Sequence, residues 1–92
     1  MNPQSHEISA HAKFQMKRRG ISEDVLDTIL KAPGQVMDSV AGRKIFQSRF
    51  SFSEKGDTKQ YLVRVVMDLS LDPPIVVTVY CASRIDKYWR EE

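Results

Sequence analysis

The sequence predicts an α+β domain in which two N-terminal helices pack on one face of a four-stranded antiparallel sheet, followed by a short C-terminal helical turn. Apolar residues recur at helical spacing as far as Pro33, and the period changes to two after it. The segments between the predicted strands are too short for the crossover connections that parallel strands need. With 92 residues and a hydrophobic fraction of 41%, the chain is expected to form one domain, residues 1–92.

Two helices are predicted before Pro33. Ser9 is expected to cap the first helix, and Gly20 to end it after Arg19 in a left-handed conformation. Ser22 is expected to cap the second helix, which Pro33 stops. Their buried faces are predicted from apolar residues spaced three or four apart: Ile8, Ala12 and Met16, then Val25, Leu26, Ile29 and Leu30. The two-residue turn between the helices predicts an αα-hairpin.

Four strands are predicted after Pro33, at about residues 35–40, 43–53, 60–68 and 75–82. Alternation divides their side chains between two faces. One face, the core face, is expected to be buried: Phe46, Phe50, Phe52, Val63, Val65, Val77, Val79. The other, the polar face, is basic and partly aromatic: Arg43, Gln47, Arg49, Arg64, Thr78, Tyr80. Helices on one side only would leave the polar face open to solvent.

Both ends of the chain have weaker patterns. The residues before Ser9 are compatible with a short edge strand, and Ser83 to Arg90 with a last helical turn. Tyr88 and Trp89 are expected to dock on the body of the domain from that turn. Closing the core is the expected role of Trp89, the only tryptophan, and stacking on a base is the alternative.

Composition excludes several classes of protein. No stretch approaches the ~20 apolar residues of a membrane helix, and the N-terminus lacks a signal profile, so a cytoplasmic protein without membrane contact is expected. Cys81 is the only cysteine, which excludes an internal disulfide and a cysteine cluster for zinc. His6 and His11 make a poor metal site, and no phosphate loop or catalytic triad is present. Neither a metal nor another cofactor is therefore expected.

Arg64 is the residue that the pattern singles out for chemistry. It lies in a strand built mainly of Leu, Val and Met, where an unpaired charge is costly, and Tyr80 on the next strand is the expected partner. A guanidinium beside a phenol can stabilise a pentavalent phosphorane and move a proton, as an RNase does when the ribose 2′-hydroxyl is the nucleophile. Arg43 is a second candidate for the phosphate. His11 is a candidate proton-transfer group or, alternatively, a hydrogen-bonded histidine near a helix start.

Four basic residues are predicted to bind nucleic acid: Arg43, Arg49, Arg64 and Lys87. A solvated surface position is the alternative for Arg43 and Arg49. The cluster Lys17-Arg18-Arg19 ends the first helix, where complementing the helix dipole is the favoured explanation.

Motifs along the chain resemble one known family. In order they are Ser9-x-His11-Ala12, Met16-x-x-Arg19-Gly20-Ile21, Pro33, Gly42-Arg43, Tyr61-Leu62-Val63-Arg64-Val65, Thr78-Val79-Tyr80 and Lys87-Tyr88-Trp89. Together, over about residues 8–90, they resemble the small bacterial family called domain of unknown function 4258, whose name implies no established activity. That family usually has Arg-Met where this chain has Gln15-Met16, so an arginine available to the family is absent here.

The order of two helices and a meander is also similar to the RelE, ParE and BrnT toxins. That similarity of architecture implies a RelE-like domain with a basic RNA-cleaving site on the open sheet face. The expected function is a metal-independent endoribonuclease toxin of a toxin–antitoxin system, with RNA and an antitoxin protein as partners. The alternatives are a non-catalytic module that binds nucleic acid or protein, and a toxin-like domain that has lost activity, as Gln15 would allow.

Overall fold

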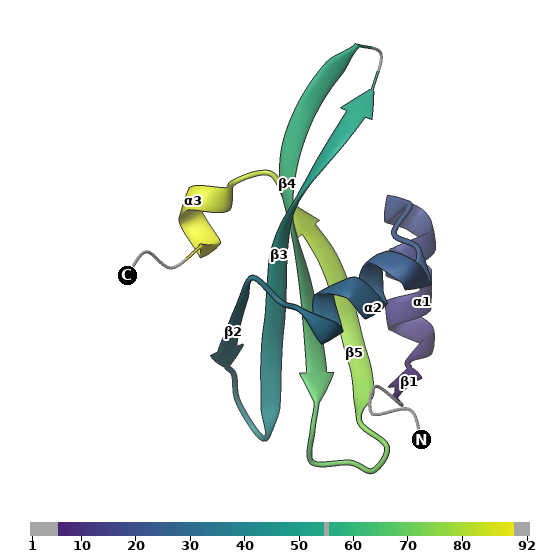
Figure 1. The fold of residues 1–92 in the computed structure, drawn as a ribbon. Helices are drawn as coiled ribbons and strands as arrows, with labels where there is room; N and C mark the ends of the chain where they lie inside the picture. The colour runs from purple at the N-terminus through teal and green to yellow at the C-terminus, as the bar shows by residue number, and fades with distance from the viewer. Residues whose placement is uncertain (1–5, 55, 90–92) are drawn as a thin grey trace.

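The computed structural model describes residues 6–54 and 56–89. Within them, five strands form one mixed sheet in the order β1-β5-β4-β3-β2 (Figure 1). The helices α1 and α2 lie on one side of the sheet, and α3 lies on the other (Figure 1). The elements are β1 (Glu7–Ile8), α1 (Ala10–Arg19), α2 (Glu23–Lys31), β2 (Gln35–Asp38), β3 (Arg43–Glu54), β4 (Asp57–Asp68), β5 (Ile75–Ala82) and α3 (Ile85–Tyr88).

The α+β class, the two N-terminal helices, the C-terminal turn and the antiparallel pairing of the four predicted strands are confirmed. The prediction that these four strands make up the whole sheet is wrong. The short strand β1 pairs in parallel with β5 and adds a fifth strand, which makes the sheet mixed. Backbone bonds from Glu7 to Pro74 (2.9 Å) and from Ser9 to Val76 (3.0 Å) hold it there. Two residues are too few to show a period of two, so the sequence signal for β1 was weak.

Side-chain caps fix both N-terminal helices, as predicted. Ser9 Oγ accepts a hydrogen bond from the backbone N–H of Ala12 at 3.0 Å and donates to the carbonyl of Val77 at 2.9 Å. Ser22 Oγ accepts from the N–H of Val25 at 3.2 Å, and Gly20 ends α1 with a φ of 72°. The hydroxyl of Ser9 therefore both starts α1 and ties it to β5.

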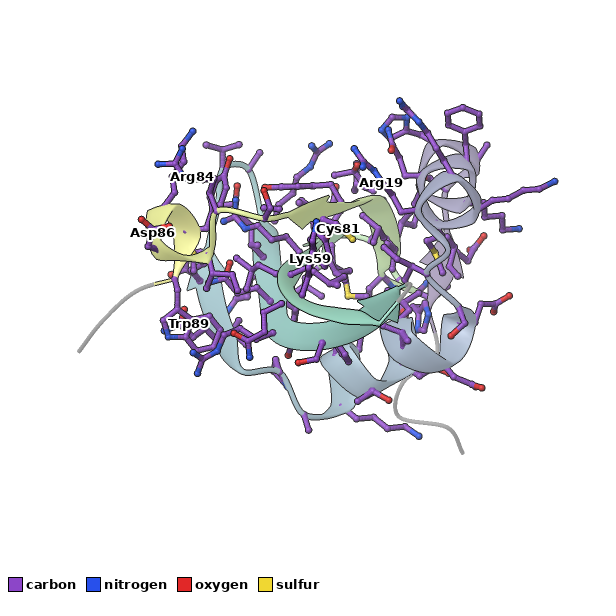
Figure 2. The ribbon with its side chains drawn as sticks, turned by 90° about the horizontal axis from the view of Figure 1, so that it is seen from above. Arg19, Lys59, Cys81, Arg84, Asp86 and Trp89 are labelled. Carbon is purple, nitrogen blue, oxygen red and sulfur yellow. The ribbon has the colours of Figure 1, made fainter. Side chains whose placement is uncertain are left out.

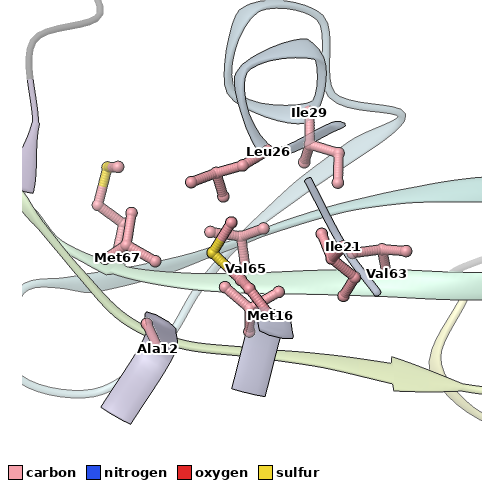
Figure 3. Packing of buried hydrophobic residues seen from close by; sticks show 10 residues of the cluster. Ala12, Met16, Ile21, Leu26, Ile29, Val63, Val65 and Met67 are labelled. Atoms are coloured by element: carbon pink, nitrogen blue, oxygen red, sulfur yellow. The ribbon is translucent and has the colours of Figure 1, made fainter. Parts of the chain in front are cut away.

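The core lies between the two helices and the core face of the sheet (Figure 3). Its buried apolar members are Ala12, Met16, Ile21, Leu26, Ile29, Val63, Val65, Met67, Val76 and Val79. Phe46 and Phe50 pack against it and are partly buried, and the side chain of Phe52 lies outside the described part. None of the described helices is long and apolar enough to span a membrane.

The predicted burial of Val77 is wrong, because β5 contains a bulge. Pairing passes from Val66 with Thr78 to Met67 with Val76, which leaves Val77 as an extra residue. Val76 therefore occupies the core position, and Val77 is half-buried. The alternation beyond the bulge is unaffected, so Thr78 remains on the predicted face.

Candidate functional site

Arg64 lies at the middle of the polar face, in a row that crosses three strands. Gln47 on β3 and Tyr80 on β5 are its direct partners in the strand pairing. Its Nε donates to Gln47 Oε1 at 2.9 Å, and its Nη1 donates to the hydroxyl of Tyr80 at 2.5 Å. The expected pairing of Arg64 with Tyr80 is confirmed, and these bonds fix the guanidinium in one orientation.

Gln47 joins Arg64 to the edge of the sheet. Its side chain is fully buried, and Nε2 donates to Gln35 Oε1 at 2.8 Å and to the carbonyl of Tyr88 at 3.2 Å. We call Gln35, Gln47, Arg64 and Tyr80 the Arg64 network. Gln47 was assigned to the polar face but was not predicted as a site residue. The only signal in the sequence was that Gln47, two residues before Arg49, shares its face of the strand. The pairing of Gln47 with Arg64 on the neighbouring strand is visible only in the folded sheet.

The expectation that the polar face is open is wrong around Arg64. Leu62 and Gln47 are 0% exposed and Arg64 is only 7% exposed, although all three point away from the helix pair. After β5 the chain returns across this face, so that α3 lies opposite α1 with Trp89 beside it (Figures 1 and 2). Residues 85–89 therefore form a C-terminal cover over the Arg64 network.

Ring faces hold the cover in place. The Tyr88 ring lies 4.4 Å from Arg64 Cζ, and the Trp89 ring lies 4.3 Å from Arg49 Cζ. Trp89 docks on the body, as expected, but on the polar face and not on the core. It packs against Gly34, where a Cβ would lie 2.9 Å from Trp89 Cη2. Cation–π contacts of this kind contribute roughly 0.5–2 kcal/mol each.

The charge of Arg64 is not neutralised by any carboxylate among residues 6–54 and 56–89. Its partners among these residues are an amide, a phenol, a methionine sulfur and aromatic rings. By contrast, Arg43 lies 3.9 Å from an oxygen of Asp68, and Arg84 lies 4.0 Å from one of Asp86. A buried guanidinium whose partners are all neutral favours an anion at the site.

Two of the other predicted basic residues lie beside the network. Arg49 is exposed under Trp89, and Lys87 is exposed on α3, with its Nζ 5.4 Å from the Tyr88 ring. Arg43 shares the polar face but lies at its far end, in the row of Asp68 and Ile75. Arg49 and Lys87 therefore flank the covered site, whereas Arg43 does not.

His11 is not brought to this site. It is exposed on α1, in the helix layer, and the sheet separates it from Arg64 and Tyr80. Gln15 lies on the same helix, so the departure from the family pattern at that position does not touch the Arg64 network.

Two groups near these strands have shifted pKa values. Hydrogen bonds from the hydroxyl and the N–H of Ser70 lower the pKa of Asp68, and the charge of Arg43 adds to the effect. Burial raises the pKa of the Cys81 thiol, against a smaller opposing effect of Arg19. Among the described residues, no three His, Cys, Asp or Glu side chains gather as metal ligands.

One comparison with known proteins identifies a family. The model of the family described as domain of unknown function (DUF4258) matches residues 8–81. The chain belongs to this family. No curated protein and no solved structure matches the chain. The DUF4258 match contains Arg64 and Tyr80 and ends at Cys81, so the C-terminal cover follows the matched region.

Proposed function

We propose that this DUF4258 domain is a metal-independent endoribonuclease toxin with a RelE-like fold, acting at Arg64 and Tyr80. One observation carries the proposal: a guanidinium that is only 7% exposed, has no carboxylate partner in the described chain and donates to a phenol. A fixed cation beside a proton-transfer group is the minimum that phosphoester cleavage without a metal requires.

The reaction at this site is an attack of the ribose 2′-oxygen on the adjacent phosphorus. The P–O2′ bond forms, the P–O5′ bond breaks, and the product is a 2′,3′-cyclic phosphate. Arg64 stabilises the negative charge that the phosphorane gains. Tyr80 accepts a hydrogen bond from Arg64 and keeps its own O–H, which it donates to the leaving 5′-oxygen. The proton of the 2′-hydroxyl passes to water, and water reprotonates the tyrosinate.

The substrate reaches Arg64 only when the C-terminal cover lifts. The cover is suited to this, because α3 is a single turn of 4 residues without a side-chain cap or a buried residue. Its aromatic contacts with Arg49 and Arg64 are contacts that an RNA base can replace, since every base offers a π-face. Exposed Arg49 and Lys87 then contact the flanking phosphates.

Burial of Arg64 also favours a second function, a non-catalytic module that binds RNA. In that case Arg64 orders the sheet and the cover, and RNA binds the exposed cations beside it. Cleavage separates the two functions, because a binding module retains affinity for RNA and leaves it intact.

The toxin function implies a neutralising protein, and the edge strand β2 offers a place for it. β2 is only four residues long and pairs with β3 through Lys44–Gln47, so its outer edge has no strand beside it within the described chain. Val36 in this strand is 46% exposed. An antitoxin strand added there would extend the sheet by pairing with the backbone of β2. Native mass spectrometry of the domain co-expressed with the product of the neighbouring gene tests for the complex.

The deciding experiment is cleavage of a 5′-labelled RNA by the purified domain in EDTA. We expect cleavage with 2′,3′-cyclic phosphate or 3′-phosphate ends, because the proposed chemistry uses only protein groups. Loss of cleavage on chelation, restored by a divalent ion, would contradict it. RNA that is bound but never cleaved would favour the binding module.

A further inference from the structure

The outward side of α1 is basic and carries one exposed aromatic ring. The helix contains Lys13, Lys17, Arg18 and Arg19, and it contains no acidic residue. All four cations are exposed, and Phe14 between them is 62% exposed. In a helix, residues three and four apart are neighbours, so Lys17 and Arg18 both lie next to Phe14.

The fold gives no internal reason for this arrangement. The side of α1 that packs in the core is formed by Ala12 and Met16, and Phe14 takes no part in it. Among the described residues, none of the four cations forms an ion pair with a carboxylate. Lys13 and Lys17 are like charges four residues apart, an arrangement that destabilises a helix.

The helix dipole explains only part of the pattern. It favours cations in the last turn, where Lys17, Arg18 and Arg19 lie. It does not explain Lys13, which lies in the first half of the helix, or the exposed ring of Phe14. Within the described chain, neither the dipole nor the core accounts for these two features.

We propose that Lys13, Phe14, Lys17 and Arg18 bind single-stranded RNA, with the ring stacked on a base and the cations on phosphates. Cations interleaved with an aromatic ring match the chemistry of a single strand, whose bases are free to stack. A membrane fits less well, because the helix buries its apolar side in the core and has only Phe14 as a large exposed apolar side chain to insert. The choice of RNA rests on the proposed function and extends it to a second contact.

The position of α1 allows one RNA to reach both surfaces. α1 packs on β5, and β1 pairs with β5 only at Ile75 and Val76, so the rest of that edge has no strand beside it in the described chain. Arg19 extends from α1 toward β5 (Figure 2), close enough to influence the pKa of Cys81, the neighbour of Tyr80. An RNA strand that leaves Tyr80 and passes around this edge of the sheet meets the end of α1.

The test measures binding of a fluorescent RNA of about 12 nucleotides by anisotropy, over a series of salt concentrations. Phe14→Leu keeps an apolar side chain without the ring and should weaken binding roughly fivefold or more. The pair Lys13→Gln and Lys17→Gln should flatten the slope of log K against log salt by about 1.4, since each single-strand phosphate contact contributes roughly 0.7. Leu and Gln both have high helix propensity and the three positions are exposed, so the temperature of thermal unfolding should be unchanged in both variants.

The matched control is Lys31→Gln with Lys59→Gln, which removes the same charge from exposed positions on α2 and β4 and should leave the slope nearly unchanged. Equal slopes for the two pairs, or wild-type affinity in Phe14→Leu, would overturn the proposal. The proposal would also be overturned if the α1 variants lost binding to phosphatidylserine vesicles and kept wild-type binding to RNA. RNA binding that depends on α1 without any cleavage upholds this surface and refutes the nuclease. RNA cleavage and RNA binding that are both unaffected by these changes would uphold the nuclease and refute the α1 surface.

Discussion

The guanidinium of Arg64 on β4 donates a hydrogen bond to the hydroxyl of Tyr80 on β5, directly across the strand pair. The bond lies under the Tyr88 ring, where Arg64 is almost closed to water. Because each side chain satisfies the other in this closed position, removal of either leaves a buried polar group without its partner. Such a group costs about 1–3 kcal/mol. Activity and stability therefore need to be measured separately at both positions.

Arg64→Lys should lower the rate of RNA cleavage on the order of a hundredfold. An ammonium keeps the charge but loses the planar fork that donates to Gln47 and Tyr80 at once. The measurement is the single-turnover cleavage rate per folded molecule, with the folded fraction taken from circular dichroism. Arg84→Lys, at an exposed position on the N-terminal side of α3, is the control and should cleave at nearly the wild-type rate. A folded Arg64→Lys protein with the wild-type rate would show that Arg64 is only structural.

Tyr80→Phe should also reduce cleavage by a hundredfold or more, on the order expected for loss of a general acid. The change removes one hydroxyl and leaves the ring, but it leaves the buried Nη1 of Arg64 without its acceptor, so the free energy of unfolding should fall by about 1–3 kcal/mol. Tyr61→Phe removes a hydroxyl from the same sheet, on the core face beside Phe50, and is the matched control. If the two variants cleave RNA equally fast, the hydroxyl of Tyr80 takes no part in the reaction.

Trp89 should report whether the C-terminal cover lifts. It is the only tryptophan, and its ring lies on Arg49 and against Gly34 in the closed state. Saturating RNA should shift its fluorescence emission to longer wavelength and make it easier to quench with acrylamide, because the ring becomes exposed to water. The same titration with Lys13→Gln and Lys17→Gln should need more RNA to reach the same shift. An unchanged emission at RNA concentrations that saturate anisotropy would mean that RNA binds with the cover closed.

Asp68→Asn should destabilise the domain at neutral pH, and the difference should disappear in acid. The hydrogen bonds from Ser70 lower the pKa of Asp68 in the folded state, whereas the unfolded chain keeps the ordinary value of about 3.9. This stabilisation is present above the ordinary value and is lost as the pH falls through the lowered folded value. Urea unfolding of both proteins at neutral pH and at steps below about pH 4 measures it. Ser70→Ala should reduce the difference, and a difference that stays constant in acid would contradict the assignment.

The alternation of side chains along a strand was enough to predict the part of the site that lies within regular strands. Alternation alone placed Arg64 and Tyr80 on one face, because the period of two holds wherever the pairing is regular. The bulge at Val77 escaped this reasoning because an extra residue leaves no trace in composition. The cover over Arg64 escaped it because the docking of Trp89 depends on the space above Gly34, which exists only in the folded sheet.

The hydroxyl of Ser9 donates to a carbonyl 68 positions later, at Val77, so the start of α1 is fixed to the sheet only when most of the chain is available. Contacts so distant in sequence form late, because the long intervening loop must close first. During synthesis, α1 lacks its main strand partner until β5 has left the ribosome, and the cover follows β5. The Arg64 network is therefore completed only when β5 has joined the sheet, before the cover can dock. The proposed nuclease site is therefore absent from the growing chain until Tyr80 on β5 has paired with Arg64.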